Sequence, residues 1–104
     1  MDISFQDKKL QKFCEDYKQL SRKYGNQQAE NIIQRIGELR SAENLYDISK
    51  LPQARLHALS QDRDKQFAVD LKHPKRLILL PLVGSAADLK SIVSVSIVEI
   101  TDYH

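Results

Sequence analysis

The chain has 104 residues, of which 41% are hydrophobic, and this is enough for one small domain with a single core. Sixteen Lys and Arg nearly balance fourteen Asp and Glu, and the resulting net charge of +2 excludes a disordered polyelectrolyte. Three isolated glycines exclude a glycine-rich phosphate loop, and the single cysteine excludes an internal disulfide and a cysteine-based zinc site. We therefore expect one domain that spans residues 1–104.

The sequence carries no apolar signal-peptide run at its start, and no segment approaches the ~20 apolar residues of a membrane helix. We expect a cytoplasmic protein without membrane contacts, in which the single thiol stays reduced. The sequence pI of about 8.7 is a weak indication of a polyanionic partner.

The first part of the chain predicts a short strand and then a helix. Residues 2–5 alternate polar and apolar side chains, which is typical of a strand. Between residues 8 and 24 the apolar side chains recur at intervals of three and four, the pattern of an amphipathic helix. Asp7 or Ser4 is suited to cap the start of this helix, and Cys14 lies on its apolar face, where we expect it to pack in the core.

A second helix follows almost at once. Apolar residues again recur at helical spacing up to residue 39, and Asn26 is suited to cap the start of this segment. Because only Gly25 and Asn26 separate the two patterns, we expect the helices to form an antiparallel hairpin. The irregular segment 42–54 is long for a small domain and favours either a short helical turn or a functional loop.

The second half of the chain changes to the patterns of strands. Leu56 and Leu59 flank a short strand, and residues 66–71 alternate as a half-buried strand does. The apolar run 77–80 predicts a central strand, and Pro81 predicts that its far end pairs on one side only. A loop then leads to a last strand rich in Val and Ile over residues 92–100.

This order of elements predicts an α+β fold, with a helical hairpin on one face of a small antiparallel sheet. No helix is left to cover the other face, which is therefore available for a ligand or a partner. Residues 55–76 lie in the sheet half and hold six cations against three anions, together with His57 and His73. Cations fixed on strands and tight loops form a platform for phosphates, although a solvated charged surface explains the same composition.

A signature of HigB-type toxins, in the RelE/ParE superfamily of type II toxin–antitoxin systems, resembles the block Leu56-His57-Ala58-Leu59-Ser60-Gln61-Asp62-Arg63-Asp64-Lys65-Gln66-Phe67-Ala68-Val69. The family pattern runs Leu-His-x-Leu-x-Gly-Asp-Arg-x-Gly before an aromatic residue that opens a strand. The next family strand begins with Arg, as at Arg76, and several members end in Asp-Tyr-His, as residues 102–104 do. The order of strand, two helices and further strands is also that of the family, so the resemblance spans the whole chain.

Two departures from the family pattern lie in this block. Gln61 and Lys65 stand where the family has glycines, which puts the conformation of the turn in question because glycine alone tolerates positive φ easily. Ser60 replaces a common lysine, and this predicts a weaker nuclease or a substitute role for Lys65.

The resemblance implies a RelE-like microbial RNase fold and a ribosome-dependent endoribonuclease that cuts mRNA without a metal or other cofactor. In that reaction the RNA 2′-hydroxyl attacks the adjacent phosphorus and the 5′-oxygen leaves. The partners implied are the ribosome, mRNA and a cognate HigA-like helix-turn-helix antitoxin. The implied catalytic residues are His57, Arg76, Asp102, Tyr103 and His104, and the implied RNA- or phosphate-binding residues are Arg55, Arg63, Lys65 and Lys72.

Other readings of the same residues stay open. From pattern alone, His57 is ordinary polar surface and the terminal triplet is a frayed chain end. Members of the ParE branch act by binding DNA gyrase and lack the nuclease residues, so a nuclease-silent toxin is one alternative and a non-catalytic RNA-binding module is another. The presence of His57 together with a terminal Asp-Tyr-His favours the nuclease, but the sequence does not say which histidine is the acid and which is the base.

Overall fold

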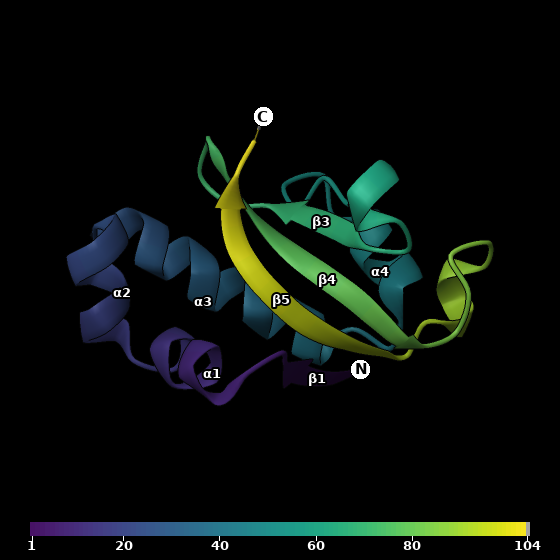
Figure 1. Cartoon of the computed structure of the whole chain (residues 1–104), viewed down its shortest axis with the longest axis horizontal. Helices are drawn as coiled ribbons and strands as arrows, with labels where there is room; N and C mark the ends of the chain where they lie inside the picture. Colours follow the sequence, from purple (N-terminus) through teal and green to yellow (C-terminus); the bar gives the residue numbers. More distant parts are fainter. Residues whose placement is uncertain (104) are drawn as a thin grey trace.

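The computed structural model describes residues 1–103, and its elements confirm the α+β class (Figure 1). In chain order these elements are β1 (Asp2–Phe5), α1 (Lys8–Cys14), α2 (Tyr17–Tyr24), α3 (Asn26–Ser41), α4 (Leu45–Ser49), β2 (His57–Ala58), η1 (Gln61–Arg63), β3 (Phe67–Asp70), β4 (Lys75–Val83), η2 (Leu89–Ser91) and β5 (Ser94–Asp102). Within the described chain, no helix is both long and apolar enough to cross a membrane.

The five strands form one sheet in the order β1-β5-β4-β3-β2. Strands β2 to β5 pair antiparallel as expected, but β1 pairs parallel to β5, so the sheet is mixed and the prediction of an antiparallel sheet is wrong at this edge. Parallel neighbours need a long connection, and here the helices and three strands supply it. As predicted, β4 beyond Leu79 pairs only with β5, because β3 begins at Phe67, opposite Leu79.

The first expected helix is two helices. Asp16 breaks the segment and caps α2, since its carboxylate accepts the Gln19 backbone N–H at 3.2 Å; Asp7 caps α1 in the same way through Leu10. The apolar spacing runs through this break and therefore hides it. The hairpin is formed by α2 and α3, and Gly25, with φ at +87°, is the residue that turns the chain. Gly25 rather than Asn26 is also the N-cap of α3, and no side chain caps that helix.

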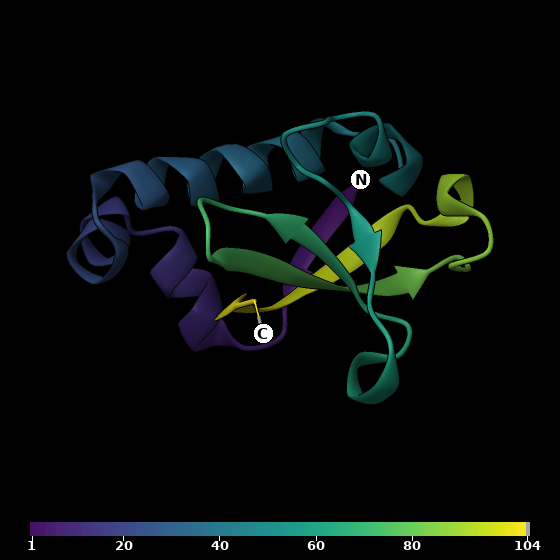
Figure 2. The same ribbon diagram turned by 90° about the horizontal axis from the view of Figure 1, so that it is seen from above.

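The core lies between the helices and one face of the sheet. Leu77 and Leu79 of β4 are fully buried with Ile32 and Leu39 of α3, and Figure 2 shows α3 running along this face. Cys14 also packs in the core, and burial raises the pKa of its thiol to about 11. The irregular segment 42–54 contains the short helix α4, the first of the two alternatives.

The second sheet face is not fully open, contrary to the expectation. The turn that contains η1 folds across it, on the side opposite α3 (Figure 2). Arg63 in this turn forms an ion pair with Glu99 of β5 at 2.8 Å, and Ala68 and Ile78 beneath are fully buried. The part left uncovered is the end of the sheet at which β3 ends and β4 begins.

Candidate functional site

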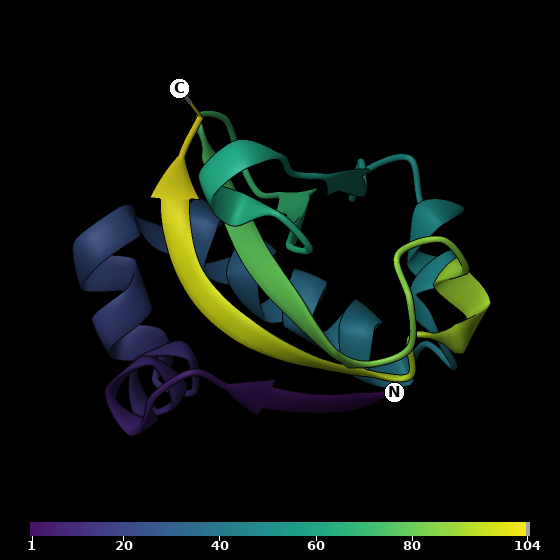
Figure 3. The ribbon, with the colours of Figure 1, turned by 45° about the vertical axis from the view of Figure 1, so that its right-hand side comes forward.

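The strand register gathers the chemically active side chains on the sheet face opposite the helices. His57 pairs with Ala68, and Asp70 pairs with Arg76, which in turn pairs with Thr101. Directly paired residues share a face and successive residues alternate, so Tyr103 lies on the same face as Arg76. Figures 1 and 3 show the C-terminal end of β5 beside the β3–β4 turn. We call Arg55, His57, His73, Arg76 and Tyr103 the Tyr103 cluster.

Tyr103 is the centre of this cluster. Its ring is roughly parallel to that of His57, with centroids 6.0 Å apart, and to that of His73, with centroids 6.3 Å apart. The guanidinium carbon of Arg76 lies 4.9 Å from its centroid, and that of Arg55 lies 5.3 Å away. The backbone N–H of Tyr103 donates to the carbonyl of Pro74 at 2.8 Å, which ties the end of β5 to the β3–β4 turn. Two guanidinium groups and two imidazoles therefore surround one aromatic ring.

Arg76 holds an unused hydrogen-bond donor in this cluster. Its Nε is buried and has no partner among the described residues. Leaving a buried donor unsatisfied costs about 1–3 kcal/mol, so such a group calls for a bound acceptor. Beside it is an open pocket of about 390 Å³, lined by Arg76 and residues 59–63. Arg76 lines this polar pocket, and a guanidinium is suited to bind a phosphate there.

His57 has a defined hydrogen-bond partner on one ring nitrogen. Its Nδ1 lies 2.8 Å from the backbone carbonyl oxygen of Arg55. A carbonyl oxygen only accepts, so Nδ1 is the donor and carries the proton. In the neutral ring the lone pair is then on Nε2, which is the form required of a general base. Arg55 has a positive φ of +41°, so the backbone turns at the residue whose carbonyl contacts His57.

The guanidinium of Arg55 forms hydrogen bonds to other side chains of the protein. It donates to both carboxylate oxygens of Asp70, at 2.7 and 3.3 Å, and to the hydroxyl of Tyr103. The hydrogen bond to Asp70 raises the pKa of Arg55. The guanidinium of Arg55 thus positions Tyr103 against the sheet.

The other expected phosphate ligands are paired with protein groups or line other hollows, one of which His73 also lines. Arg63 lines the same pocket as Arg76, but it donates to Glu99 and Gln66. Lys65 lines a separate hollow near Pro81. Lys72 lines a third hollow at the tip of the α2–α3 hairpin, together with Lys23 and Lys75.

Asp102 and Tyr103, the two described residues of the terminal triplet, lie on opposite faces of the sheet. Asp102 pairs with Lys75 in the register that faces the helices, and this contact raises the pKa of Lys75. Asp102 is therefore on the face opposite Tyr103. His104 lies outside the described residues. His73 is a member of the cluster that the expected site did not include, and its place between two strands gave no signal beyond its being a histidine in a basic segment.

The turn after β2 matches the family pattern in its backbone. Gln61 has φ at +57° and Lys65 has φ at +69°, the left-handed region that favours glycine. These are the two positions at which the resemblance expects glycine. The chain keeps the backbone conformation of the glycine turn with residues that adopt it less easily.

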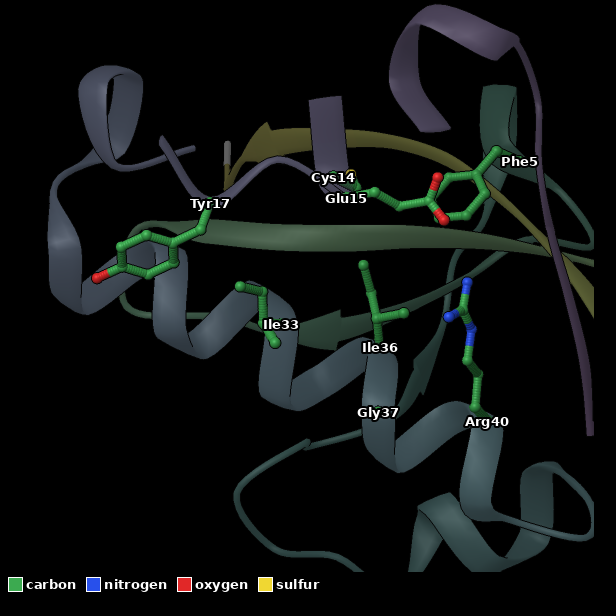
Figure 4. Close-up of a pocket in the computed structure, with 8 residues that line it drawn as sticks. All are labelled: Phe5, Cys14, Glu15, Tyr17, Ile33, Ile36, Gly37 and Arg40. Atoms are coloured by element: carbon green, nitrogen blue, oxygen red, sulfur yellow. The ribbon is translucent and has the colours of Figure 1, made fainter. Parts of the chain in front are cut away.

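A second concave surface has different chemistry. This groove, of about 330 Å³, lies between α3 and the segment from β1 to α2, and Figure 4 shows Ile36 and Arg40 rising from α3 toward Glu15 and Phe5. Most of its lining is apolar, and Ile33 is 44% exposed. Such a lining is unsuited to an anion, and the Tyr103 cluster, with its two guanidinium groups, is the better candidate for binding one. Among the described residues, no three His, Cys, Asp or Glu side chains lie close enough together to hold a metal ion.

No protein-family model matches the sequence, and no curated protein matches it significantly. One solved structure with the same fold is a YoeB/ParE toxin from Agrobacterium tumefaciens. The two chains are 10% identical, each is covered over 100% of its length, and the TM-score is 0.55. This likeness confirms the fold that the family resemblance implied.

Proposed function

We propose that the chain is the toxin of a toxin–antitoxin system and that it cleaves mRNA on the ribosome, as HigB-type toxins do. The observation that carries this proposal is that Arg76, with an unpartnered buried Nε, and His57, with a free Nε2, both lie against the ring of Tyr103. The shared fold with a YoeB/ParE toxin supports it, and so do the left-handed angles of Gln61 and Lys65 at the glycine positions of the HigB-type signature.

The cluster can perform two parts of a cleavage by the RNA 2′-hydroxyl. Nε2 of His57 takes the 2′ proton as the 2′-oxygen bonds to phosphorus. The guanidinium of Arg76 donates to the phosphoryl oxygens, where negative charge grows in the transition state. The ring of Tyr103 lies between these groups and holds Arg76 and the two imidazoles in place around it. Bond formation at the 2′-oxygen and breakage of the bond to the 5′-oxygen give a 2′,3′-cyclic phosphate and a 5′-hydroxyl.

The proposal also names the partners. A HigA-like helix-turn-helix antitoxin neutralises the toxin, and the ribosome holds the mRNA in position. Because the ribosome orders the substrate, a small open site is sufficient for the chemistry. Lys72 and the nearby lysines of the hairpin tip offer charge to an RNA backbone that leaves the cluster across the β3–β4 turn.

Cleavage of mRNA on programmed ribosomes tests the proposal. The purified chain is added to ribosomes translating a defined mRNA, and the cut sites are mapped by primer extension. We expect cuts within the A-site codon, little cleavage of free RNA, and loss of cleavage on Arg76→Ala. The control is Arg22→Ala, which removes an exposed cation of α2.

Two other results would contradict the proposal. Efficient cleavage of free RNA would make the chain a free-standing nuclease. No cleavage in either setting would favour a toxin that acts by binding a protein such as gyrase.

A further inference from the structure

The cluster contains a second imidazole that the proposed reaction has not used. His73 lies in the β3–β4 turn, and its ring centroid is 6.3 Å from that of Tyr103 with an 18° angle between the planes. Among the described residues, none forms a hydrogen bond with either ring nitrogen of His73. The carbonyl of the next residue, Pro74, holds the backbone of Tyr103, so this turn and Tyr103 are fixed to each other.

The proposed cleavage needs a proton donor on the side of the phosphorus opposite to the general base. In-line displacement puts the attacking 2′-oxygen and the leaving 5′-oxygen on opposite sides of phosphorus. The base and the acid must therefore come from different elements. His57 comes from β2 at the edge of the sheet, and His73 comes from the turn between β3 and β4.

Among the residues that the structure describes, the other groups around Tyr103 are poor donors to a leaving oxygen. A guanidinium keeps its proton at any ordinary pH, which excludes Arg55 and Arg76 as the general acid. A phenol ordinarily titrates near ~10, further from neutral pH than an imidazole. His57 carries its proton on the nitrogen that faces the Arg55 carbonyl. Imidazole is the side chain whose ordinary pKa lets it give a proton near neutral pH.

We propose that His73 is the general acid of this reaction, an inference that rests on the proposed function. As the bond between phosphorus and the 5′-oxygen breaks, the His73 imidazolium gives its proton to that oxygen. At the same time Nε2 of His57 takes the 2′ proton. The step ends with a 2′,3′-cyclic phosphate, a 5′-hydroxyl, a charged His57 and a neutral His73, so protons and charge balance.

A leaving group that needs no proton tests this role. A short mRNA is synthesised with sulfur in place of the 5′-oxygen at the scissile bond, bound to ribosomes, and compared with the ordinary mRNA in single-turnover cleavage. A thiolate leaves without an acid. We expect His73→Gln to slow cleavage of the ordinary mRNA by about 10²–10⁴-fold and that of the sulfur substrate far less. His57→Gln should slow both substrates alike.

A second variant separates proton transfer from stacking. His73→Phe keeps a flat ring beside Tyr103 but has no proton to give, so it should behave as His73→Gln does. The inference is wrong if His73→Phe keeps full activity, or if His73→Gln slows both substrates equally. It is also wrong if His104→Ala, and not His73→Gln, shows rescue by sulfur. Failure of the unmodified chain to cleave ordinary mRNA would instead overturn the proposed function, and this inference with it.

Discussion

Gln61 and Lys65 adopt backbone angles that glycine takes without strain. Their φ values are +57° and +69°. A residue with a Cβ in the left-handed region is strained by about 1–2 kcal/mol, and substitution by glycine relieves this strain. Part of the gain in stability is lost again, because glycine gives the unfolded chain more conformational freedom. We predict that Gln61→Gly and Lys65→Gly each raise the free energy of unfolding by about 0.5–1 kcal/mol. Urea denaturation followed by circular dichroism measures this change.

Gly84 provides the control for this prediction, because replacing this glycine should destabilise the chain. It has φ at +100°, and a Cβ there would lie 2.2 Å from the carbonyl oxygen of Ser91. Gly84→Ala should therefore destabilise the chain while the two turn variants stabilise it. A loss of stability in Gln61→Gly would mean that its side chain makes contacts worth more than the strain.

Arg76 is expected to act through paired hydrogen bonds as well as charge. Its Nε has no partner among the described residues, and a guanidinium offers parallel donors to two oxygens of a phosphate, which an ammonium does not. We predict that Arg76→Lys keeps part of the RNA binding but less of the rate, with kcat falling more than about tenfold. Single-turnover cleavage at saturating ribosomes measures the rate separately from binding. Equal rates for Arg76→Lys and the unchanged chain would show that charge alone suffices.

The family resemblance named three residues that the fold brings together, but the sequence did not indicate their hydrogen-bond partners. His57, Arg76 and Tyr103 meet on one face because strand register brings them together, and the family signature named all three. Nothing in the sequence indicated that Arg55 pairs with Asp70, because that contact depends on which strands are neighbours. The same holds for His73, which enters the cluster only once the β3–β4 turn is folded against β5.

At the scale of elements, the side chain of Arg35 ties α3 to the end of β3. Arg35 is buried, donates to the carbonyl of Asp70 at 2.8 Å and forms an ion pair with Glu38 at 2.7 Å. Burial acts to raise the pKa of Glu38, but hydrogen bonds from Arg35, Gln53 and Gln34 outweigh it and the pKa is lowered. The ionised carboxylate therefore stabilises the junction of α3 and β3.

This lowered pKa predicts a pH dependence of stability. A carboxyl whose pKa is lower in the folded state stabilises above its unfolded pKa of ~4.3, and this contribution is lost as the pH falls through the folded value. Glu38→Gln should thus be less stable than the unchanged chain at pH 7, and the difference should narrow by pH 3. Urea denaturation at both pH values measures it. Glu30→Gln, on the exposed side of the same helix, is the control, and a difference that widens toward low pH would contradict the assignment.

The sequence pattern predicted some of the helices and strands but not how all of them pair or where they break. The apolar pattern located four of the strands: Leu56 and Leu59 indicated β2, alternation indicated β3, the apolar run 77–80 indicated β4, and a segment rich in Val and Ile indicated β5. It could not reveal that β1 pairs parallel to β5, since pairing partners are chosen by tertiary packing. It also could not separate α1 from α2, because Cys14 and Leu20 keep the helical spacing across the break at Asp16.

At the scale of the whole molecule, the two faces of the sheet carry the core and the proposed active site separately. The helix-facing side holds the core, with Leu77, Leu79 and Ile97 fully buried. The opposite side carries the Tyr103 cluster, which η1 leaves uncovered. Stability and activity should then respond to different substitutions, even at neighbouring residues of one strand.

Arg76 and Leu77 are adjacent in β4 and point to opposite faces, so they provide the most direct comparison. Leu77 is fully buried, and Leu77→Ala should lower the free energy of unfolding by about 2–5 kcal/mol through lost burial and a cavity. Arg76→Ala removes a contact with Tyr103 but also an unsatisfied buried donor, so its free energy of unfolding should stay within about 1 kcal/mol of the original. The chain has no tryptophan, so circular dichroism in urea measures both variants. In the cleavage assay the order should reverse, with Arg76→Ala inactive and the folded fraction of Leu77→Ala active. If Arg76→Ala proves as destabilising as Leu77→Ala, the guanidinium supports the fold, and the assignment of this face to chemistry is wrong.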